Sequence, residues 1–265
     1  MILSSLQNPR VKDVVKLRQR SHRDEAGLML IEGYREILRA IENRHYPTQL
    51  FTCPALFLGE NEPTLIARCA SAGAEVIECS AAVFEKLAYR DRPEGLLALA
   101  PQLNCSLAVL KLPANPLVLV AESIEKPGNL GTLLRSADAA GAHAVIVADP
   151  LTDVHNPNVI GASTGMLFAV PLAVAETAEV LAWLRAQSIK ILAATPHSDK
   201  NYTDVDMTQG VAIVVGTEQL GLRDVWMKAA DIQVRIPMLG KADSLNVAQA
   251  ATLLLYEAVR QRRAR

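Results

Sequence analysis

The feature that most constrains the fold is a series of short, almost uninterrupted Val, Ile, Leu and Ala runs in the second half of the chain. Strands with one solvated face alternate apolar and polar residues, whereas continuous apolar runs are typical of strands buried on both faces of a parallel sheet. These runs are PLVLVAE, HAVIVAD, LFAVPLAV, IKILAAT, VAIVVG and IQVRIPM, and they begin at residues 116, 143, 167, 189, 211 and 232. The sequence therefore predicts a parallel α/β sheet covered by helices.

The first hundred residues alternate strand and helix patterns on a smaller scale. A basic helix is expected near residues 9–20, and helical apolar spacing recurs at Ile37, Leu38 and Ile41. A segment rich in Pro and Asn, residues 101–116, ends this alternation. We therefore expect an α/β protein with two domains, 1–104 and 116–265, joined by a linker at 105–115. The strands expected in the first domain are LMLIEG, TQLFTC, AEVIEC and GLLALA, with further helices near 64–72 and 80–88.

Composition excludes several classes of protein. Half of the 265 residues are hydrophobic, yet no apolar run approaches the length of a membrane span. The first residues, MILSSLQNPRVK, lack the apolar core of a signal peptide. We therefore expect a cytoplasmic protein that does not enter a membrane. The four cysteines include no C-x-x-C pair and the five histidines are scattered, which predicts reduced thiols and no metal.

Charge is close to balanced overall but unevenly distributed. A net charge of −1 provides no bulk attraction to nucleic acid, so any such affinity must come from local basic clusters. Clusters of this kind bind phosphates or are simply solvated helix ends, and the residues alone leave both interpretations open. The basic residues near the two termini are Arg10, Lys12, Lys16, Arg18, Arg20 and Arg23, and Arg260, Arg262, Arg263 and Arg265.

Polar or glycine-rich loops follow three of the expected buried strands, at the sheet edge where α/β proteins bind ligands. The first is EKPGNLGTLLRSADAAGA, residues 125–142. Asn129 stands where we expect the N-cap of a helix. Arg135 falls on the polar side of that helix, where its simplest role is an ion pair with Asp138.

The other two loops carry a carboxylate and a Ser-Leu-Asn step. VAIVVGTEQLGL, residues 211–222, has G-x-E-x-x-G rather than the dinucleotide fingerprint G-x-G-x-x-G. Glu218 would repel a pyrophosphate, which disfavours NAD or ATP. RIPMLGKADSLNV, residues 235–247, leads into the last helix, with Ser244 or Asn246 as a candidate N-cap. Backbone N–H and C=O groups of this loop could bind a flat heterocycle, with the side chains of Ile236 and Leu245 as apolar walls.

Taken together and in this order, the three loops resemble the motifs of the SpoU (TrmH-type) RNA 2′-O-ribose methyltransferases of the SPOUT class. The matching patterns are N-x-G-x-x-x-R from Asn129, G-x-E-x-x-G-L from Gly216, and I-P-M followed by S-L-N-V from Ile236. The resemblance extends over the whole chain, because LIEGYREILRAI and PEGLLALA are similar to the family's ribosomal-protein-like RNA-binding domain. Two positions depart from it: Gln219 replaces a common glycine, and Gly161 replaces a common arginine, which leaves one expected RNA contact open.

The resemblance implies a deep trefoil knot, a homodimer, S-adenosylmethionine as cofactor, and methyl transfer to a ribose 2′-hydroxyl in structured RNA, with 23S rRNA favoured over tRNA. It implies that Arg135 is the residue that activates the hydroxyl. Because a guanidinium is normally always protonated, we expect Arg135 to stabilise the forming alkoxide and to hold the adjacent phosphate. Asn129 and Ser244 would position phosphate and ribose, Asn246 would order the loops, and Glu218 would fix the second loop. The cofactor contacts implied are Thr195, Gly216, Ile236, Met238 and Leu245.

Two functions of other classes remain as alternatives. One is a catalytically inactive RNA-binding protein of ribosome assembly, which the intact motif residues Asn129, Arg135 and Glu218, together with Ser244 and Asn246, disfavour. The other is a dinucleotide-dependent oxidoreductase on an open sheet. The missing G-x-G-x-x-G fingerprint and the Glu218 carboxylate disfavour it.

Overall fold

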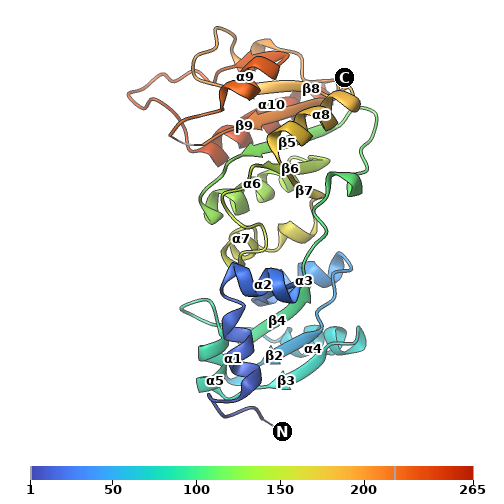
Figure 1. Ribbon diagram of the computed structural model, residues 1–265, viewed down its shortest axis with the longest axis vertical. Helices are drawn as coiled ribbons and strands as arrows, with labels where there is room; N and C mark the ends of the chain where they lie inside the picture. Colours follow the sequence, from blue (N-terminus) through green and yellow to red (C-terminus); the bar gives the residue numbers. More distant parts are fainter. Residues whose placement is uncertain (1, 218, 265) are drawn as a thin grey trace. The chain divides into compact units, whose positions relative to one another are not determined.

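The computed structural model describes residues 2–217 and 219–264, which form two compact units (Figure 1). The first unit contains Met1–Leu103 together with Asp153–Ala169, and the second contains Asn104–Thr152 together with Val170–Arg265. The segment 153–169 therefore packs with the first unit, although residues of the second unit flank it in sequence. The segment predicted as a linker belongs to the second unit, where the Cys105 carbonyl accepts a hydrogen bond of 2.7 Å from the Val174 N–H.

A mixed sheet with the order β1-β4-β2-β3 forms the centre of the first unit. Strands β1 and β2 run antiparallel to β4, whereas β2 and β3 are parallel. The strands are β1 (Leu28–Glu32), β2 (Gln49–Thr52), β3 (Glu75–Glu78) and β4 (Leu96–Pro101). The helices are α1 (Pro9–Lys16), α2 (Arg20–Ala26), α3 (Tyr34–Glu42), α4 (Glu62–Ser71), α5 (Ala81–Leu87) and α7 (Pro157–Ala162), with 3₁₀ turns η1 (Pro54–Leu56) and η3 (Met166–Phe168).

The basic helix expected near residues 9–20 is two helices. Helix α1 begins after Asn8, whose side chain accepts from the Arg10 N–H, and it ends at Lys16. A turn at 17–19 separates it from α2, and Arg23 stabilises this turn by donating to the carbonyls of Leu17 and Arg18. Arg23 also donates to Asp153 at 2.5 Å and is only 1% exposed. These acceptors offset the cost of burying the Arg23 guanidinium. Because Arg23 is buried, it does not belong to the basic surface of the N-terminus.

A parallel sheet with the order β10-β8-β9-β5-β6-β7 forms the second unit, as the apolar runs predict. Every residue of β5, β6 and β9 is buried. The strands are β5 (Leu117–Glu122), β6 (Ala144–Ala148), β7 (Leu172–Ala175), β8 (Lys190–Ala194), β9 (Val211–Val215) and β10 (Ile232–Val234). The remaining elements are α6 (Pro127–Ala139), α8 (Thr177–Ala186), α9 (Asp224–Ala229), α10 (Val247–Arg263), η2 (Leu107–Val109) and η4 (Tyr202–Asp204).

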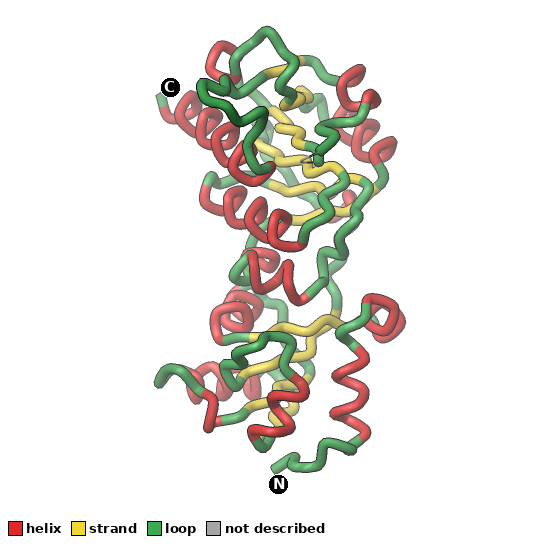
Figure 2. The backbone as a smooth tube through the Cα atoms, turned by 90° about the vertical axis from the view of Figure 1, so that its left-hand side faces the viewer, coloured by secondary structure: helices red, strands yellow, loops and turns green. Residues whose placement is uncertain are grey.

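Helices cover both faces of this sheet (Figure 2). Helices α6 and α10 pack against each other, and α10 lies against β5 and β9, whereas α8 contacts β6 and β8. A 2.7 Å hydrogen bond between the hydroxyls of Ser136 and Thr252 joins α6 to α10. Two strands are shorter than expected. Strand β7 begins only at Leu172, because Leu167 and Phe168 belong to η3, and β10 ends at Val234 rather than continuing through Met238. Among the described residues, no helix combines the length and apolarity that a membrane crossing needs.

Candidate active site

The carboxyl ends of β8, β9 and β10, together with the start of α10, enclose a cavity of about 350 Å³. This volume is within the range of small-molecule sites, which combine apolar walls with a few polar groups. The cavity brings together all the residues assigned to cofactor contact from the sequence, and Ser244 with them. Its lining includes Thr195, Gly216, Ile236, Met238, Ser244 and Leu245. Segments far apart in sequence thus meet at the sheet edge where α/β folds bind ligands.

A tight turn after β9 forms one wall of the cavity. Thr217 and Gly221 exchange backbone hydrogen bonds of 3.1 and 3.0 Å, and Gly221 has a positive φ of 66°. Gly216 packs so closely on this turn that a Cβ added there would lie 2.2 Å from the Gly221 carbonyl oxygen. Glu218 lies outside the described residues, so its side chain is not placed here.

We expect Gly216→Ala to weaken binding of S-adenosylmethionine by roughly 10-fold, because overpacking of about 1–3 kcal/mol must displace the turn that forms the cavity wall. Isothermal titration calorimetry measures the effect. Gly240→Ala is a suitable control, because no atom lies within 4 Å of the added Cβ, its φ is not in the positive region, and the residue does not line the cavity. Equal cofactor affinity in Gly216→Ala and the parent would contradict the steric argument.

Asn246 joins the third loop to the first. It is the N-cap of α10, since its Oδ1 accepts from the Ala248 N–H at 3.0 Å, and its Nδ2 donates to Asn129 Oδ1 at 3.1 Å. Of the two N-cap candidates for this helix, Asn246 is therefore the right one and Ser244 is not. The N-cap prediction for Asn129 is wrong: α6 starts at Pro127 after Lys126, because proline favours the first helical position.

The side chain of Arg135 is exposed on the surface of α6. It forms no hydrogen bond or ion pair within the part of the chain that the structure describes, so the predicted pair with Asp138 is absent. Because α6 is held to α10 by Ser136 and by Asn129, the backbone that carries Arg135 is fixed relative to the cavity. Its guanidinium is accordingly available to an external anion.

A cluster around Arg223 was not anticipated from the sequence. The Arg223 backbone N–H and Nε donate to the two oxygens of Glu122, at 3.0 and 2.5 Å, and its Nη2 donates to Asp149 and Thr177. Although burial opposes it, hydrogen bonds from Thr177 and Arg223 lower the pKa of Asp149. The available signal was Glu122 itself, a carboxylate at the end of an otherwise apolar strand, which needs a partner when buried.

Comparison with known protein families agrees with the two-part organisation. Residues 116–256 match the model of the SpoU rRNA Methylase family, and residues 8–98 match the MRM3-like substrate binding domain. The chain belongs to the SpoU family of RNA 2′-O-methyltransferases.

Relatives in the SpoU family are similar over almost the whole chain. A 23S rRNA (uridine(2479)-2′-O)-methyltransferase of Streptomyces viridochromogenes is 34% identical over 255 residues, which are 93% of this chain and 87% of the relative. A crystal structure of an RNA 2′-O ribose methyltransferase is 44% identical, with a TM-score of 0.87 and 99% of each chain covered. An rRNA methyltransferase of Sinorhizobium meliloti, solved with AdoMet bound, is 30% identical, with a TM-score of 0.89 and coverage of 98% and 97%.

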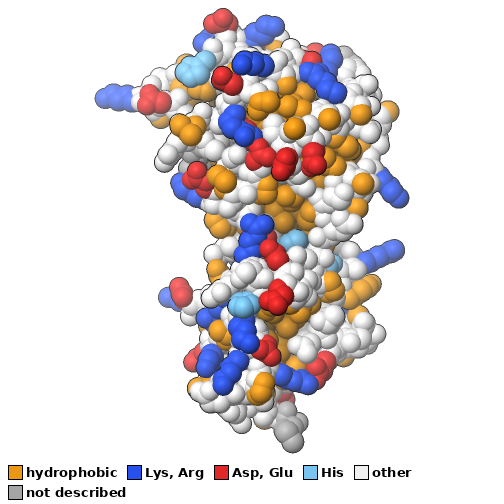
Figure 3. Space-filling model, in the orientation of Figure 1, with side chains coloured by type: hydrophobic (Ala, Val, Ile, Leu, Met, Phe, Trp, Pro, Cys, Tyr) orange, Lys and Arg blue, Asp and Glu red, His pale blue; other side chains and the backbone are white. Residues whose placement is uncertain are grey.

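The substrate-binding unit of this SpoU protein presents less free positive charge than its sequence suggests. Arg10 pairs with Glu75, Lys16 with Asp13, and Arg20 with Asp24. Arg18 donates to the carbonyls of Lys86 and Ala88. On the face drawn in Figure 3, basic side chains are accordingly interspersed with acidic ones. Lys12 is exposed and has no such partner within residues 2–217 and 219–264.

Two residues of the C-terminal basic cluster form contacts within the protein. Arg260 forms two hydrogen bonds of 2.7 Å with Glu257. Arg262 donates to the carbonyls of Asn115, Pro116, Met207 and Gln209 and thereby ties the end of α10 to the loops beside it. Arg265 lies outside the described residues. Arg260 and Arg262 therefore act as helix-end charges, whereas Arg263 is exposed and forms no hydrogen bond or ion pair among the described residues.

Proposed function

We propose that this chain transfers the methyl group of S-adenosylmethionine to a ribose 2′-hydroxyl of ribosomal RNA, with 23S rRNA as the favoured substrate. One observation carries the proposal: the second and third motif loops surround a single cavity, and the Asn129–Asn246 hydrogen bond joins the first motif loop to it. The relatives named above for 23S rRNA methylation and for bound AdoMet support the same substrate and cofactor.

The cavity fits the proposed cofactor in its chemistry. Ile236 and Leu245 offer apolar walls to an adenine ring, and the backbone of the Thr217–Gly221 turn offers hydrogen-bonding groups beside them. The close approach at Gly216 leaves no room for a side chain, so the backbone itself forms the wall. When bound, S-adenosylmethionine supplies an electrophilic methyl group on a sulfonium. The protein's task is to align the 2′-oxygen with that methyl group and to leave the hydroxyl proton a path to an acceptor outside the protein.

Arg135 is proposed to stabilise the oxygen that develops negative charge. A guanidinium is almost always protonated, so it serves as an electrostatic partner and a bidentate phosphate ligand rather than as a base. The proton then passes to a phosphate oxygen or to water. Asn129 and Ser244 are proposed to position ribose and phosphate, Asn246 to order the two loops, and Glu218 to fix the second loop. Such preorganised contacts are worth about 10²–10³ in rate when they act on transition-state charge.

Ribose-methylation mapping of total RNA from cells with and without the gene tests the proposal. We expect one or a few 2′-O-methyl positions in 23S rRNA to disappear when the gene is deleted and to return with the intact gene, but not with a gene encoding Arg135→Ala. Unchanged methylation, together with no binding of S-adenosylmethionine by calorimetry, would instead support an inactive RNA-binding protein.

We further propose that the protein is a cytoplasmic homodimer and that its second unit follows the knotted path of SPOUT proteins. The resemblance of the motifs is the support for all three statements. Leu253 and Tyr256, large side chains on α10 that are 41% and 46% exposed, provide apolar surface on which a second copy could pack. Sedimentation equilibrium measures the assembly, and a monomer at micromolar concentration would contradict it.

The first unit is proposed to bind RNA through its N-terminal helices, and the structure modifies the expected size of the effect. Changing Lys12, Lys16 and Arg20 together to Gln should reduce the magnitude of the salt slope of log affinity by about 0.7 to 2, since each single-strand phosphate contact contributes about 0.7. The lower value applies if Lys16 and Arg20 stay paired with their carboxylates and Lys12 alone binds phosphate.

RNA affinity measured across a salt series gives this slope. A control variant that changes Lys111, Lys190 and Lys228 to Gln removes the same charge from exposed positions of the second unit. If both triple variants change the slope equally, or neither changes it, the N-terminal helices are not the RNA surface.

A further inference from the structure

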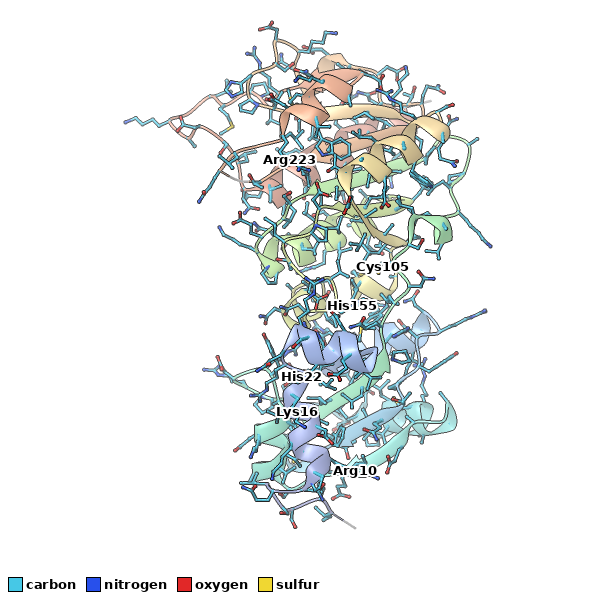
Figure 4. All side chains as sticks on the ribbon, in the orientation of Figure 1. Arg10, Lys16, His22, Cys105, His155 and Arg223 are labelled. Atoms are coloured by element: carbon cyan, nitrogen blue, oxygen red, sulfur yellow. The ribbon has the colours of Figure 1, made fainter. Side chains whose placement is uncertain are left out.

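Four polar side chains meet at the carboxyl edge of the parallel sheet, across the neighbouring strands β9, β5, β6 and β7. Glu122 ends β5, Asp149 follows β6, Thr177 begins α8 after β7, and Arg223 follows the turn after β9. Arg223 holds the other three, because its backbone N–H and Nε bind Glu122 while its Nη2 binds Asp149 and Thr177. Figure 4 labels Arg223 at this edge.

This arrangement differs from an ordinary surface ion pair. Glu122 is only 1% exposed, and both of its oxygens accept from Arg223. A buried carboxylate of this kind depends on its partner far more than an exposed one does. The backbone beside it is also held in an uncommon conformation: Ser123 and Asp149 have positive φ values of 50° and 46°. Non-glycine residues keep such conformations only where the surroundings impose them, and they concentrate at functional sites.

The cluster lies between the two loops that the reaction needs to align. Arg223 directly follows Gly221 and Leu222, which line the cavity. Glu122 directly precedes the loop that leads to Asn129 and to the helix of Arg135. A shift of one loop relative to the other would move the methyl donor relative to the ribose, and misplacement by about 1 Å is enough to cost on the order of 10²-fold in rate.

We propose that Arg223 is a positioning residue for methyl transfer, which clamps the cofactor loop at 216–222 to the start of the loop at 123–129 through the buried Glu122 carboxylate. This inference rests on the proposed function. Arg223 itself contacts neither cofactor nor RNA in the proposal; it acts through the two loops. It therefore affects both the binding of S-adenosylmethionine and the alignment that sets kcat.

Arg223→Gln and Arg223→Lys test the proposal, with Arg185→Gln as a matched control. Arg185 and Arg223 are similarly exposed, at 49% and 53%, and each pairs with an aspartate. Arg185, however, binds Asp231 beside the first residue of β10, at the opposite edge of the sheet from the cavity. Loss of an exposed ion pair is therefore common to both variants, whereas loss of loop alignment is specific to Arg223.

We expect Arg223→Gln to raise the Kd for S-adenosylmethionine about 10-fold or more, to lower kcat, and to accelerate amide hydrogen exchange in residues 216–222. Arg223→Lys keeps the positive charge beside Glu122 but loses the guanidinium that binds several acceptors at once. We therefore expect its Kd, kcat and exchange rate to lie between those of the parent and of Arg223→Gln. Arg185→Gln should leave Kd, kcat and exchange in this loop within about twofold of the parent. Thermal unfolding of all variants shows whether their stabilities match.

The outcomes separate this inference from the proposed function. If the parent protein binds no S-adenosylmethionine, the proposed function fails. If the parent binds it and Arg223→Gln matches the parent in Kd and kcat, the positioning role is overturned. Equal losses in Arg223→Gln and Arg185→Gln overturn it as well, because they indicate a general loss of stability. Should the Gln variant not fold, Arg223→Lys decides: parental kinetics and parental exchange in that variant overturn the proposal.

Discussion

Replacement of Arg135 by Ala should abolish methylation while S-adenosylmethionine still binds with nearly the parental affinity. Arg135 is exposed on α6 and is not among the residues that line the cavity, so its loss leaves the cofactor walls intact. What is lost is the guanidinium that we propose to bind a phosphate and to stabilise a developing alkoxide. Removal of one such contact costs on the order of 10²-fold or more in rate.

Single-turnover methylation of RNA and calorimetry with the cofactor measure the two halves of this prediction. Asp138→Ala is the control, because Asp138 is exposed on the same helix and lacks a contact with Arg135. A variant at position 135 with near-normal turnover would show that another group stabilises the oxygen. Loss of cofactor binding in that variant would place Arg135 in the cavity wall instead.

Leu245→Arg should have the opposite profile and block the cofactor. Leu245 is partly buried in the cavity lining, directly before the N-cap residue Asn246, so its backbone cannot move away without disturbing α10. A long cation at this position fills the cavity and brings an unpaired charge against apolar walls. We expect affinity for S-adenosylmethionine to fall by at least about 100-fold, which corresponds to about 2.8 kcal/mol.

Leu239→Arg is the matched control for this substitution. Leu239 belongs to the same loop, but it is 98% exposed and does not line the cavity. Calorimetry should give parental affinity for the control and no measurable binding for Leu245→Arg. Circular dichroism establishes that both variants fold. Unchanged affinity in Leu245→Arg would mean that the cofactor binds elsewhere on the second unit.

The parts of this molecule that could be predicted from sequence are those with local causes. The buried strands follow from their apolar runs, and Asn246 caps α10 because an Asn before a helix satisfies an otherwise unpaired N–H. The prediction for Asn129 was wrong for an equally local reason, since Pro127 two residues earlier already starts α6. The roles assigned to Arg135, Ser244 and the residues lining the cavity remain predictions.

The unpredicted features depend on contacts between residues distant in sequence. Arg223 and Glu122 are 101 residues apart, and Arg23 and Asp153 are 130 apart. No periodicity or spacing reports such a pair. The basic N-terminus illustrates the consequence: six positive residues look like one surface in the sequence, yet Arg23 is buried and several others have acidic partners.

The discontinuous composition of the first unit has a consequence for the order of events during synthesis. This unit is completed by the residues from Asp153 to Ala169, and Arg23 has no carboxylate partner until Asp153 has been added. By then the ribosome has already produced β5 and β6 of the other sheet. The first unit therefore receives its last segment only after part of the second unit has been synthesised, unlike consecutive domains, which fold as separate units in chain order. The Leu17 and Arg18 carbonyls can accept from Arg23 early in synthesis, but the carboxylate that neutralises its charge in the folded unit is translated only after β5 and β6.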